Sequence, residues 1–240
     1  MKIALITSNE LRHLYFVNKI SELINVDFTF LESKKKTSKS LRKTEKKYFI
    51  KLKDYSPKMD HLFINSGEIN EQKTYNFLND LALDFIFTFG CSLLKPKIFK
   101  IPRYGTINIH TGLVQNYRGV DSSMWAAYDN NFELIGSTIH YIDNTIDGGK
   151  IIDQKRIDLS ILSKDDKIDD LFIKTCISGI DLLYDNIKNI LNFKNNPKNI
   201  NLKSKGELYQ SKDKNLQILN QAENNLANYL SSKKLSKNLR

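Results

Sequence analysis

The sequence has 240 residues, of which 40% are apolar, and a formal net charge of +10. This length supports one substantial α/β core with a small appendage rather than two large domains. The longest apolar runs, such as residues 85–89, have the length of a strand and fall far short of the roughly 18 residues that suggest a membrane span. The opening run Met1–Thr7 is not followed by a small-residue cleavage site, so we interpret it as a first strand and expect a soluble, cytoplasmic protein.

Two features of the composition narrow the class further. Cys91 and Cys176 lie far apart in apolar segments, which supports neither a disulfide framework nor a zinc site. Between Lys34 and Lys53, ten lysine and arginine residues stand against one acid, Glu45, which is a local charge of +9 out of +10. This basic segment is interpreted either as a solvated helix or loop, or as a surface that attracts an anionic substrate or polyanion. It lacks the interleaved aromatic residues that favour nucleic acid, which is not an expected partner.

Apolar periodicity predicts strands that alternate with helices along the chain. Strands are predicted at residues 2–7, 26–31, 62–65, 84–89, 106–110, 137–142 and 150–159. Helices are predicted between the first two strands, with apolar positions from Leu11 to Leu23, and at residues 70–81, 122–129, 164–193 and 216–230. This alternation predicts an α/β fold in which a mainly parallel sheet is covered by helices on both faces.

The chain is predicted to divide into a catalytic domain over residues 1–195 and a polar, helical carboxyl-terminal extension over residues 196–240. The run Asn195-Asn196-Pro197 ends the long helix and introduces the polar part. We expect the extension to dock either on the domain or on a second subunit, which would make the protein a homodimer.

Two polar side chains at the end of the strand at 106–110 are candidates for catalysis. Asn108 and His110 are two residues apart, so their side chains point to the same side of the strand. The carboxyl ends of strands in open α/β sheets surround a crevice in which reactive groups gather. An amide and an imidazole at this position could donate hydrogen bonds to a developing oxyanion, and the imidazole could also transfer a proton near neutral pH.

A later loop supplies a candidate carboxylate. Asp147 precedes two glycines, which permit a tight turn and a close backbone approach. A carboxylate beside His110 would orient the ring and favour its charged form. His140 is interpreted as a strand residue that pairs with its surroundings, and Trp125 as part of the core.

Five further residues are predicted to contact an acceptor substrate. Asn9 and Arg12 follow the first strand, where the crevice should open. Tyr117, Arg118 and Gly119 belong to the loop at 111–119, which could shape the crevice. Arg118 is interpreted either as a cation of the acceptor pocket or as a structural arginine that stabilises its own loop.

Several segments in this order resemble the formyltransferase family, clearly so over about residues 84–159. They are Asn108-Ile-His110, Tyr117-Arg-Gly119, Trp125-Ala126, Gly136-Ser-Thr-Ile-His140 and Ile146-Asp-Gly-Gly149. The family includes glycinamide ribonucleotide, methionyl-tRNA and sugar-nucleotide formyltransferases, and the resemblance implies a Rossmann-like formyltransferase fold. Its catalytic Asn, His and Asp match Asn108, His110 and Asp147. One departure is Thr111-Gly112, where the family usually has Pro-Ser, and this changes the rigidity of the loop.

The resemblance also implies the donor and the chemistry. The donor would be 10-formyltetrahydrofolate, bound largely through backbone groups of two loops, and no metal would be required. A neutral primary amine would attack the formyl carbon while the amide and the imidazole stabilise the tetrahedral oxyanion. Asp147 would orient His110 and help to remove a proton from the amine through water. The residues that correspond to the two folate-binding loops are Gly90, Cys91, Ser92, Leu94, Ile142, Asp143 and Asn144.

The amine is predicted by elimination. A glycinamide ribonucleotide enzyme should have a glycine-rich phosphate loop after its first strand, whereas Thr7–Arg12 contains no glycine. A methionyl-tRNA enzyme should have an additional β-barrel, whereas the residues after Pro197 are polar and helix-leaning. Because Gly206-Glu-Leu-Tyr209 resembles a segment of sugar formyltransferases, the favoured acceptor is the amino group of a nucleotide-linked amino sugar, a small anionic molecule. Glycinamide ribonucleotide, methionyl-tRNA and a noncatalytic folate- or metabolite-binding role are the alternatives.

Overall fold

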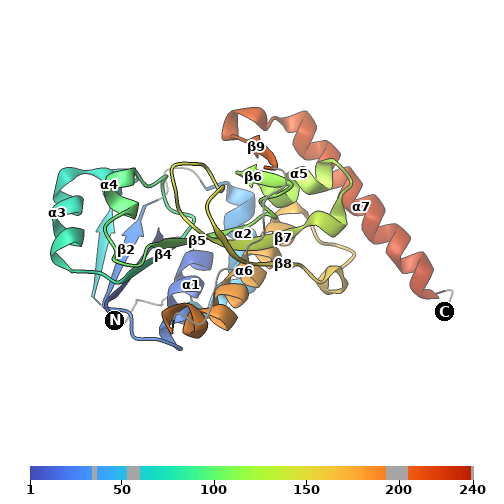
Figure 1. The fold of residues 1–240 in the computed structure, drawn as a ribbon. Coiled ribbons are helices and arrows are strands. Elements are labelled where there is room, and N and C mark those ends of the chain that lie inside the picture. The colour runs from blue at the N-terminus through green and yellow to red at the C-terminus, as the bar shows by residue number, and fades with distance from the viewer. Residues whose placement is uncertain (34–36, 53–59, 193–204, 239–240) are drawn as a thin grey trace.

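The computed structural model describes residues 1–33, 37–52, 60–192 and 205–238 and contains a seven-stranded sheet (Figure 1). Its strands lie in the order β3-β2-β1-β4-β5-β7-β8. Their bounds are β1 (Ile3–Ser8), β2 (Phe28–Glu32), β3 (His61–Ile64), β4 (Phe85–Phe89), β5 (Thr106–His110), β7 (Gly136–Tyr141) and β8 (Ile151–Arg156). The pairs from β3 to β5 are parallel, and the pairs β5-β7 and β7-β8 are antiparallel. The predicted mainly parallel α/β fold is confirmed.

Helices cover both faces of this sheet. The α-helices are α1 (Leu11–Ser21), α2 (Lys39–Phe49), α3 (Gln72–Asp80), α4 (Pro96–Phe99), α5 (Ser122–Tyr128), α6 (Ile168–Leu191) and α7 (Leu216–Asn238). Short 3₁₀ helices are η1 (Ile50–Leu52), η2 (Glu68–Asn70), η3 (Phe132–Leu134), η4 (Leu159–Ile161) and η5 (Ser211–Asp213). In Figure 1, α1 and α6 lie together on one side of the sheet, while α3 and α4 lie on the other side.

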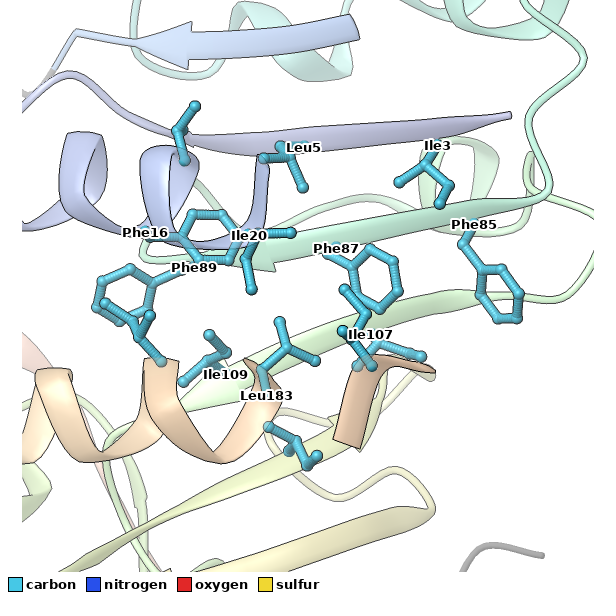
Figure 2. Packing of buried hydrophobic residues seen from close by; sticks show 14 of the residues in the cluster. Ile3, Leu5, Phe16, Ile20, Phe85, Phe87, Phe89, Ile107, Ile109 and Leu183 are labelled. Carbon is cyan, nitrogen blue, oxygen red and sulfur yellow. The ribbon is translucent and has the colours of Figure 1, made fainter. Parts of the chain in front are cut away.

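Alternation along the strands determines which side chains meet which helices. Side chains two residues apart on a strand share a face, so Ile3 and Leu5 of β1 point the same way. Together with odd-numbered residues of β4 and β5 they form a buried cluster against α1 and α6 (Figure 2). The labelled members from these strands and helices are Phe16, Ile20, Phe85, Phe87, Phe89, Ile107, Ile109 and Leu183.

The opposite face is apolar over only part of its width. Ala4, Ile6, Phe30 and Ile86 lie under α3 and α4 in a second buried cluster. Farther along the same face, the register pairs Thr88 with Asn108 and Asn108 with His140, so polar side chains replace apolar ones. The predicted catalytic strand therefore contributes one apolar face to the core and one polar face to a region that the helices α3 and α4 leave uncovered.

Most predicted elements have their predicted type, and the differences have local causes. The helix predicted from residue 164 begins at Ile168, because the Asp170 carboxylate accepts a hydrogen bond from Lys167 N and caps the first turn. The strand predicted to reach residue 159 ends at Arg156, where the chain turns toward η4. The loop predicted at 111–119 contains a short strand, β6 (Tyr117–Gly119), which no alternation of side chains predicts.

Residues 39–49 of the basic segment form the helix α2. Glu45 and Phe49 are its buried residues, whereas Lys39, Lys43 and Lys46 are exposed. Residues 34–36 and 53 of the segment lie outside the described residues. The helix therefore packs by one narrow face and presents most of its positive charge to solvent.

The described part of the extension packs on the same chain. β9 (Glu207–Tyr209) pairs in parallel with β6, and α7 packs against α5, where Asn225 Nδ2 donates to Ala127 O at 3.0 Å. The predicted boundary at residues 195 and 196 lies outside the described residues, so the division into two domains stays a prediction. Across the described ranges, no helix is both long and apolar enough to cross a membrane.

A substitution of Leu183 tests the assignment of the buried cluster against α1 and α6 as the main core of the fold. It is fully buried between α6 and the sheet, so Leu183→Ala should lower the free energy of unfolding by about 2–5 kcal/mol. Leu216→Ala is the matched control, because Leu216 is 72% exposed at the start of α7 and its loss should change this energy by less than about 0.5 kcal/mol. Urea unfolding measures both, and equal losses would contradict the assignment of the core.

Candidate active site

Asn108 lies on the polar part of the sheet face with its amide held on both sides. Its Oδ1 accepts a hydrogen bond from Thr88 Oγ1 at 2.8 Å, and its Nδ2 lies 3.2 Å from His140 Nε2. His140 Nδ1 lies 2.9 Å from Tyr141 O, which can only accept, so this nitrogen carries a proton. In the neutral ring, Nε2 then accepts from Asn108 Nδ2. The amide orientation is fixed, and one of its two N–H bonds stays available for a ligand.

His110 is more deeply buried than Asn108, with 6% of its side chain exposed. Its Nε2 lies 3.0 Å from Tyr117 O and 3.3 Å from Ser122 Oγ. Its Nδ1 lies 3.4 Å from Asp147 Oδ2. Because both ring nitrogens face oxygen atoms, the surroundings can satisfy an imidazolium as well as a neutral ring.

Asp147, the third predicted catalytic residue, lies in the loop that follows β7. Its Oδ2 accepts a hydrogen bond from Gly119 N at 2.8 Å, and its Oδ1 lies 3.6 Å from His140 Nε2. Its backbone φ is +49°, in the left-handed region, which is uncommon for a residue other than glycine and has to be held by its surroundings. The structure therefore brings the three predicted catalytic residues together around His140.

The surroundings of Asp147 change its acidity. Burial alone would raise the pKa of this carboxyl, but the positive charge of His110, the neighbouring His140 ring and the hydrogen bond from Gly119 N outweigh that effect. The pKa of Asp147 lies well below its usual range. The carboxylate is therefore ionised throughout the neutral range and can orient His110 and stabilise its charged form.

Residues of both predicted folate-binding loops pack in or against one apolar cluster, the cluster under α3 and α4. Leu94 is a buried member of the cluster under α3 and α4, and Cys91 and Ile142 pack against it. Gly90 has a φ of +58°, and a side chain there would meet the ring of His13. Ser92 N donates to the buried Glu32 carboxylate at 2.6 Å.

The distal part of the second loop is exposed. Asp143 and Asn144 face solvent, and the Asp143 carboxylate accepts from Thr145 N at 2.7 Å. Of the seven predicted folate-binding residues, Leu94, Cys91 and Ile142 lie in or against the apolar cluster and could contact an aromatic ligand. The folate-binding role of all seven stays a prediction.

The predicted acceptor residues fall into two groups. Asn9 is exposed after β1, whereas Arg12 is buried between helices and paired with Glu45, with Arg12 Nη1 2.5 Å from Glu45 Oε1. Tyr117 and Gly119 adjoin the site, because Tyr117 O faces His110 and Gly119 N contacts Asp147. The structure therefore brings Tyr117 and Gly119 to the catalytic residues and places Arg12 in a buried ion pair instead.

Arg118 contacts the backbone on two sides of the site. Its Nε donates to Gly206 O at 2.9 Å, and its Nη1 donates to Ile146 O at 3.2 Å. These contacts match the interpretation of Arg118 as a structural arginine, which the sequence left open beside the acceptor-pocket interpretation.

Thr88 and Glu32 had no assigned role in the sequence, and His140 was interpreted only as a strand residue that pairs with its surroundings. Thr88 and His140 hold the Asn108 amide, and Glu32 joins the two crevice loops by accepting from Gly67 N and Ser92 N, each at 2.6 Å. Thr88 and His140 lie opposite Asn108 in the sheet register. Their role could be predicted only if the order of the strands were known. Over the described residues, no group of three or more His, Cys, Asp and Glu side chains could hold a metal ion.

Comparisons with known proteins identify the family and the fold. The sequence profile described as formyl transferase matches residues 1–175. The methionyl-tRNA formyltransferase of Kosmotoga olearia is 34% identical over 123 residues, which are 51% of this chain and 38% of the relative. The chain therefore spans about two fifths of that relative's length.

Solved structures share the fold over nearly the whole chain. A sugar N-formyltransferase from a Shewanella species superposes with a TM-score of 0.64 at 18% identity, covering 94% of this chain and 88% of that one. An N-formyltransferase from Helicobacter canadensis, in complex with folinic acid and dTDP-3-aminofucose, superposes with a TM-score of 0.57 at 19% identity, covering 95% and 80%. The chain belongs to the formyl transferase family, which confirms the resemblance that the motifs indicate.

The low pKa of Asp147 gives a pH test. A carboxyl whose pKa is lowered on folding stabilises the protein above its unfolded pKa, about 3.9 for Asp, and this contribution is lost as the pH falls toward the folded value. Asp147→Asn should therefore be less stable than the parent protein at pH 7, and the difference should shrink as the pH falls from 5 to 3.

Urea unfolding at pH 7, 5 and 3 measures this difference. Asn tolerates the left-handed backbone at position 147, so the substitution changes mainly the charge. Asp143→Asn, on the exposed part of the same loop, is the control and should change stability at pH 7 by less. A difference for Asp147→Asn that is the same at all three pH values would contradict the linkage.

Proposed function

We propose that this chain transfers a formyl group from 10-formyltetrahydrofolate to a primary amine, and that the amine belongs to a nucleotide-linked amino sugar. The observation that carries the proposal is the meeting of Asn108, His110 and Asp147 on the polar part of the sheet face. An oriented amide donor beside an imidazole and an ionised carboxylate is the set of groups that acyl transfer to an amine needs.

The residues beside this group fit a folate donor. A folate has a flat aromatic part, and Cys91 and Ile142, which are partly exposed and pack against the apolar cluster that includes Leu94, would offer it apolar contacts. Glu32 fixes the loop at 90–94 by binding Ser92 N, so its backbone is held in one position. Bound 10-formyltetrahydrofolate would supply the activated formyl group.

Each of the three residues then has a definable task. Asn108 Nδ2 would donate a hydrogen bond to the formyl oxygen as negative charge develops on it. His110 would donate a second hydrogen bond to that oxygen. Asp147 would hold His110 in position and favour its charged form. Asp147 would also help, through water, to remove the proton that the amine loses when its nitrogen bonds to the formyl carbon, and that proton would pass to the folate nitrogen from which the formyl group departs.

The amino end of α1 also disfavours glycinamide ribonucleotide as the acceptor. The first turn of a helix can bind a phosphate through its free N–H groups. Here the Glu45 carboxylate, 1% exposed, lies in that position and accepts from Arg12 N at 3.4 Å. An anionic substrate group would have to displace a buried, ion-paired carboxylate, so this end of α1 is a poor phosphate site.

Other features support an amino-sugar nucleotide over methionyl-tRNA. The segment Gly206-Glu-Leu-Tyr209, which resembles sugar formyltransferases in sequence, contains β9 and pairs with β6 beside the catalytic residues. The Shewanella and Helicobacter proteins, which share the fold over most of this chain, are sugar N-formyltransferase and N-formyltransferase by name. The exposed lysines of α2 would attract the diphosphate of such an acceptor. A cytoplasmic location and a homodimer stay predictions, the latter to be checked by light scattering.

The proposed function is tested by following tetrahydrofolate formation from 10-formyltetrahydrofolate with a panel of amines. The panel contains amino-sugar nucleotides, glycinamide ribonucleotide and charged initiator tRNA. Turnover should occur with an amino-sugar nucleotide and should fall about a hundredfold, or about 3 kcal/mol, in Asn108→Ala. Asn79→Ala, on the exposed end of α3, is the control and should leave turnover unchanged.

The other outcomes separate the alternatives. Turnover with glycinamide ribonucleotide or tRNA alone would keep formyl transfer and replace the acceptor. Turnover without any amine would indicate a hydrolase. Folate binding without turnover under any condition would overturn the proposal in favour of a noncatalytic relative.

Thr88 tests whether the orientation of the Asn108 amide matters. Thr88→Val keeps the side-chain shape but removes the hydroxyl that donates to Asn108 Oδ1, so kcat should fall about tenfold while the KM values stay similar. Thr29→Val is a matched control on β2, because Thr29 is also fully buried and its hydroxyl has no hydrogen-bond partner within the described residues. Equal activities of the two variants would show that Thr88 does not position the amide.

A further inference from the structure

The three residues of β6 contact His110 and the loop that carries Asp147. Tyr117 O faces His110 Nε2 at 3.0 Å, and Gly119 N donates to Asp147 Oδ2 at 2.8 Å. Between them, Arg118 donates to Ile146 O, the residue before Asp147. A strand of three residues therefore holds the imidazole, the carboxylate and the loop that carries the carboxylate.

This strand is in turn held by the segment at 206–209. Gly206 N donates to Val114 O and Glu207 N donates to Asn116 O, each at 3.1 Å. Val120 N donates to Tyr209 O at 3.0 Å. The approach is close, because a side chain at Gly119, whose φ is +85°, would lie 2.0 Å from Tyr209 O. The Tyr209 ring also stacks on the buried Trp125 ring, with 4.1 Å between the ring centroids.

The Arg118 side chain contacts both the Asp147 loop and residues 206–209, the β9 segment. Its guanidinium donates to Gly206 O at 2.9 Å and to Ile146 O at 3.2 Å, so it connects the β9 segment to the Asp147 loop. The loop needs such a connection, because Asp143, Asn144, Thr145 and Ile146 are exposed and Asp147 has left-handed backbone. Two carbonyl acceptors in different segments suit the fork of an arginine, which a lysine cannot reproduce.

Building on the proposed formyl transfer, we propose that Arg118 is a positioning residue that fixes the Asp147 loop against the β9 segment. The extension then takes part in the reaction without contacting the substrate, because it supplies one end of this connection. The role differs from that of an acceptor-pocket cation, which would act on substrate affinity.

The test compares Arg118→Met and Arg118→Lys with the parent protein. If Arg118 positions the loop, kcat should fall about tenfold or more in both variants, while the KM for the amine changes less than about twofold. Lysine keeps the charge but not the fork, so it should rescue little. A raised acceptor KM that Arg118→Lys restores would overturn the proposal in favour of a substrate-binding cation.

Hydrogen exchange gives a readout that does not depend on turnover. Peptides that cover residues 143–149 and 206–209 should exchange faster in Arg118→Met, while peptides of α3 should be unchanged, which also shows that the variant is folded. Arg103→Met, at an exposed position, is the matched control and should alter neither region.

Unchanged exchange at 143–149 in Arg118→Met would contradict the positioning role. If the parent protein has no turnover with any amine, the proposed function fails while the exchange experiment still decides whether Arg118 fixes the loop.

Discussion

Burying the carboxylate of Asp147 has an energetic cost that its neighbours must offset, and this requirement shapes the rest of the site. A buried carboxylate without partners would be protonated rather than charged. Gly119 N, His110 and His140 surround it and lower its pKa instead. Each of these partners is itself held, His110 by the carbonyl of Tyr117 and His140 by its own strand neighbour. The charge that orients the imidazole therefore depends on groups from β5, β6 and β7 together.

The sheet accommodates chemistry by leaving part of one face without a helical cover. On β4, Ile86 packs under α3 and α4, while Thr88, two residues later on the same face, supports the Asn108 amide. The opposite face of the same strands is continuously apolar against α1 and α6. Because the rigid core and the polar site share strands, small displacements of the core would be transmitted to the amide and the imidazole. The site is therefore supported by the strands that it shares with the apolar core.

Sequence patterns predicted the strands, the long helix and the three residues that meet in the site. Asn108 and His110 could be paired from their spacing alone, since side chains two apart on a strand share a face. Asp147 was a candidate because it precedes two glycines, and the resemblance grouped it with Asn108 and His110, because no local rule says where a loop after Asp143 will return. Thr88 and Glu32 escaped prediction for a related reason: their partners are 20 and 35 to 60 residues away and depend on strand order and loop approach. Arg12, placed after the first strand, points into the helices because Glu45 offers it a buried partner.

The pairing of β6 with β9 has a consequence for how the molecule is made. Chains are synthesised from the amino end, and early segments can begin to fold before later ones exist. The sheet strands β1 to β8 and the residues Asn108, His110 and Asp147 all emerge before residue 206, yet the groups that hold Asp147 rest on contacts to Gly206 and Glu207. A nascent chain that ends before residue 206 therefore holds all three candidate catalytic residues without the contacts that Gly206 and Glu207 supply, and the site is completed only after these residues have been made.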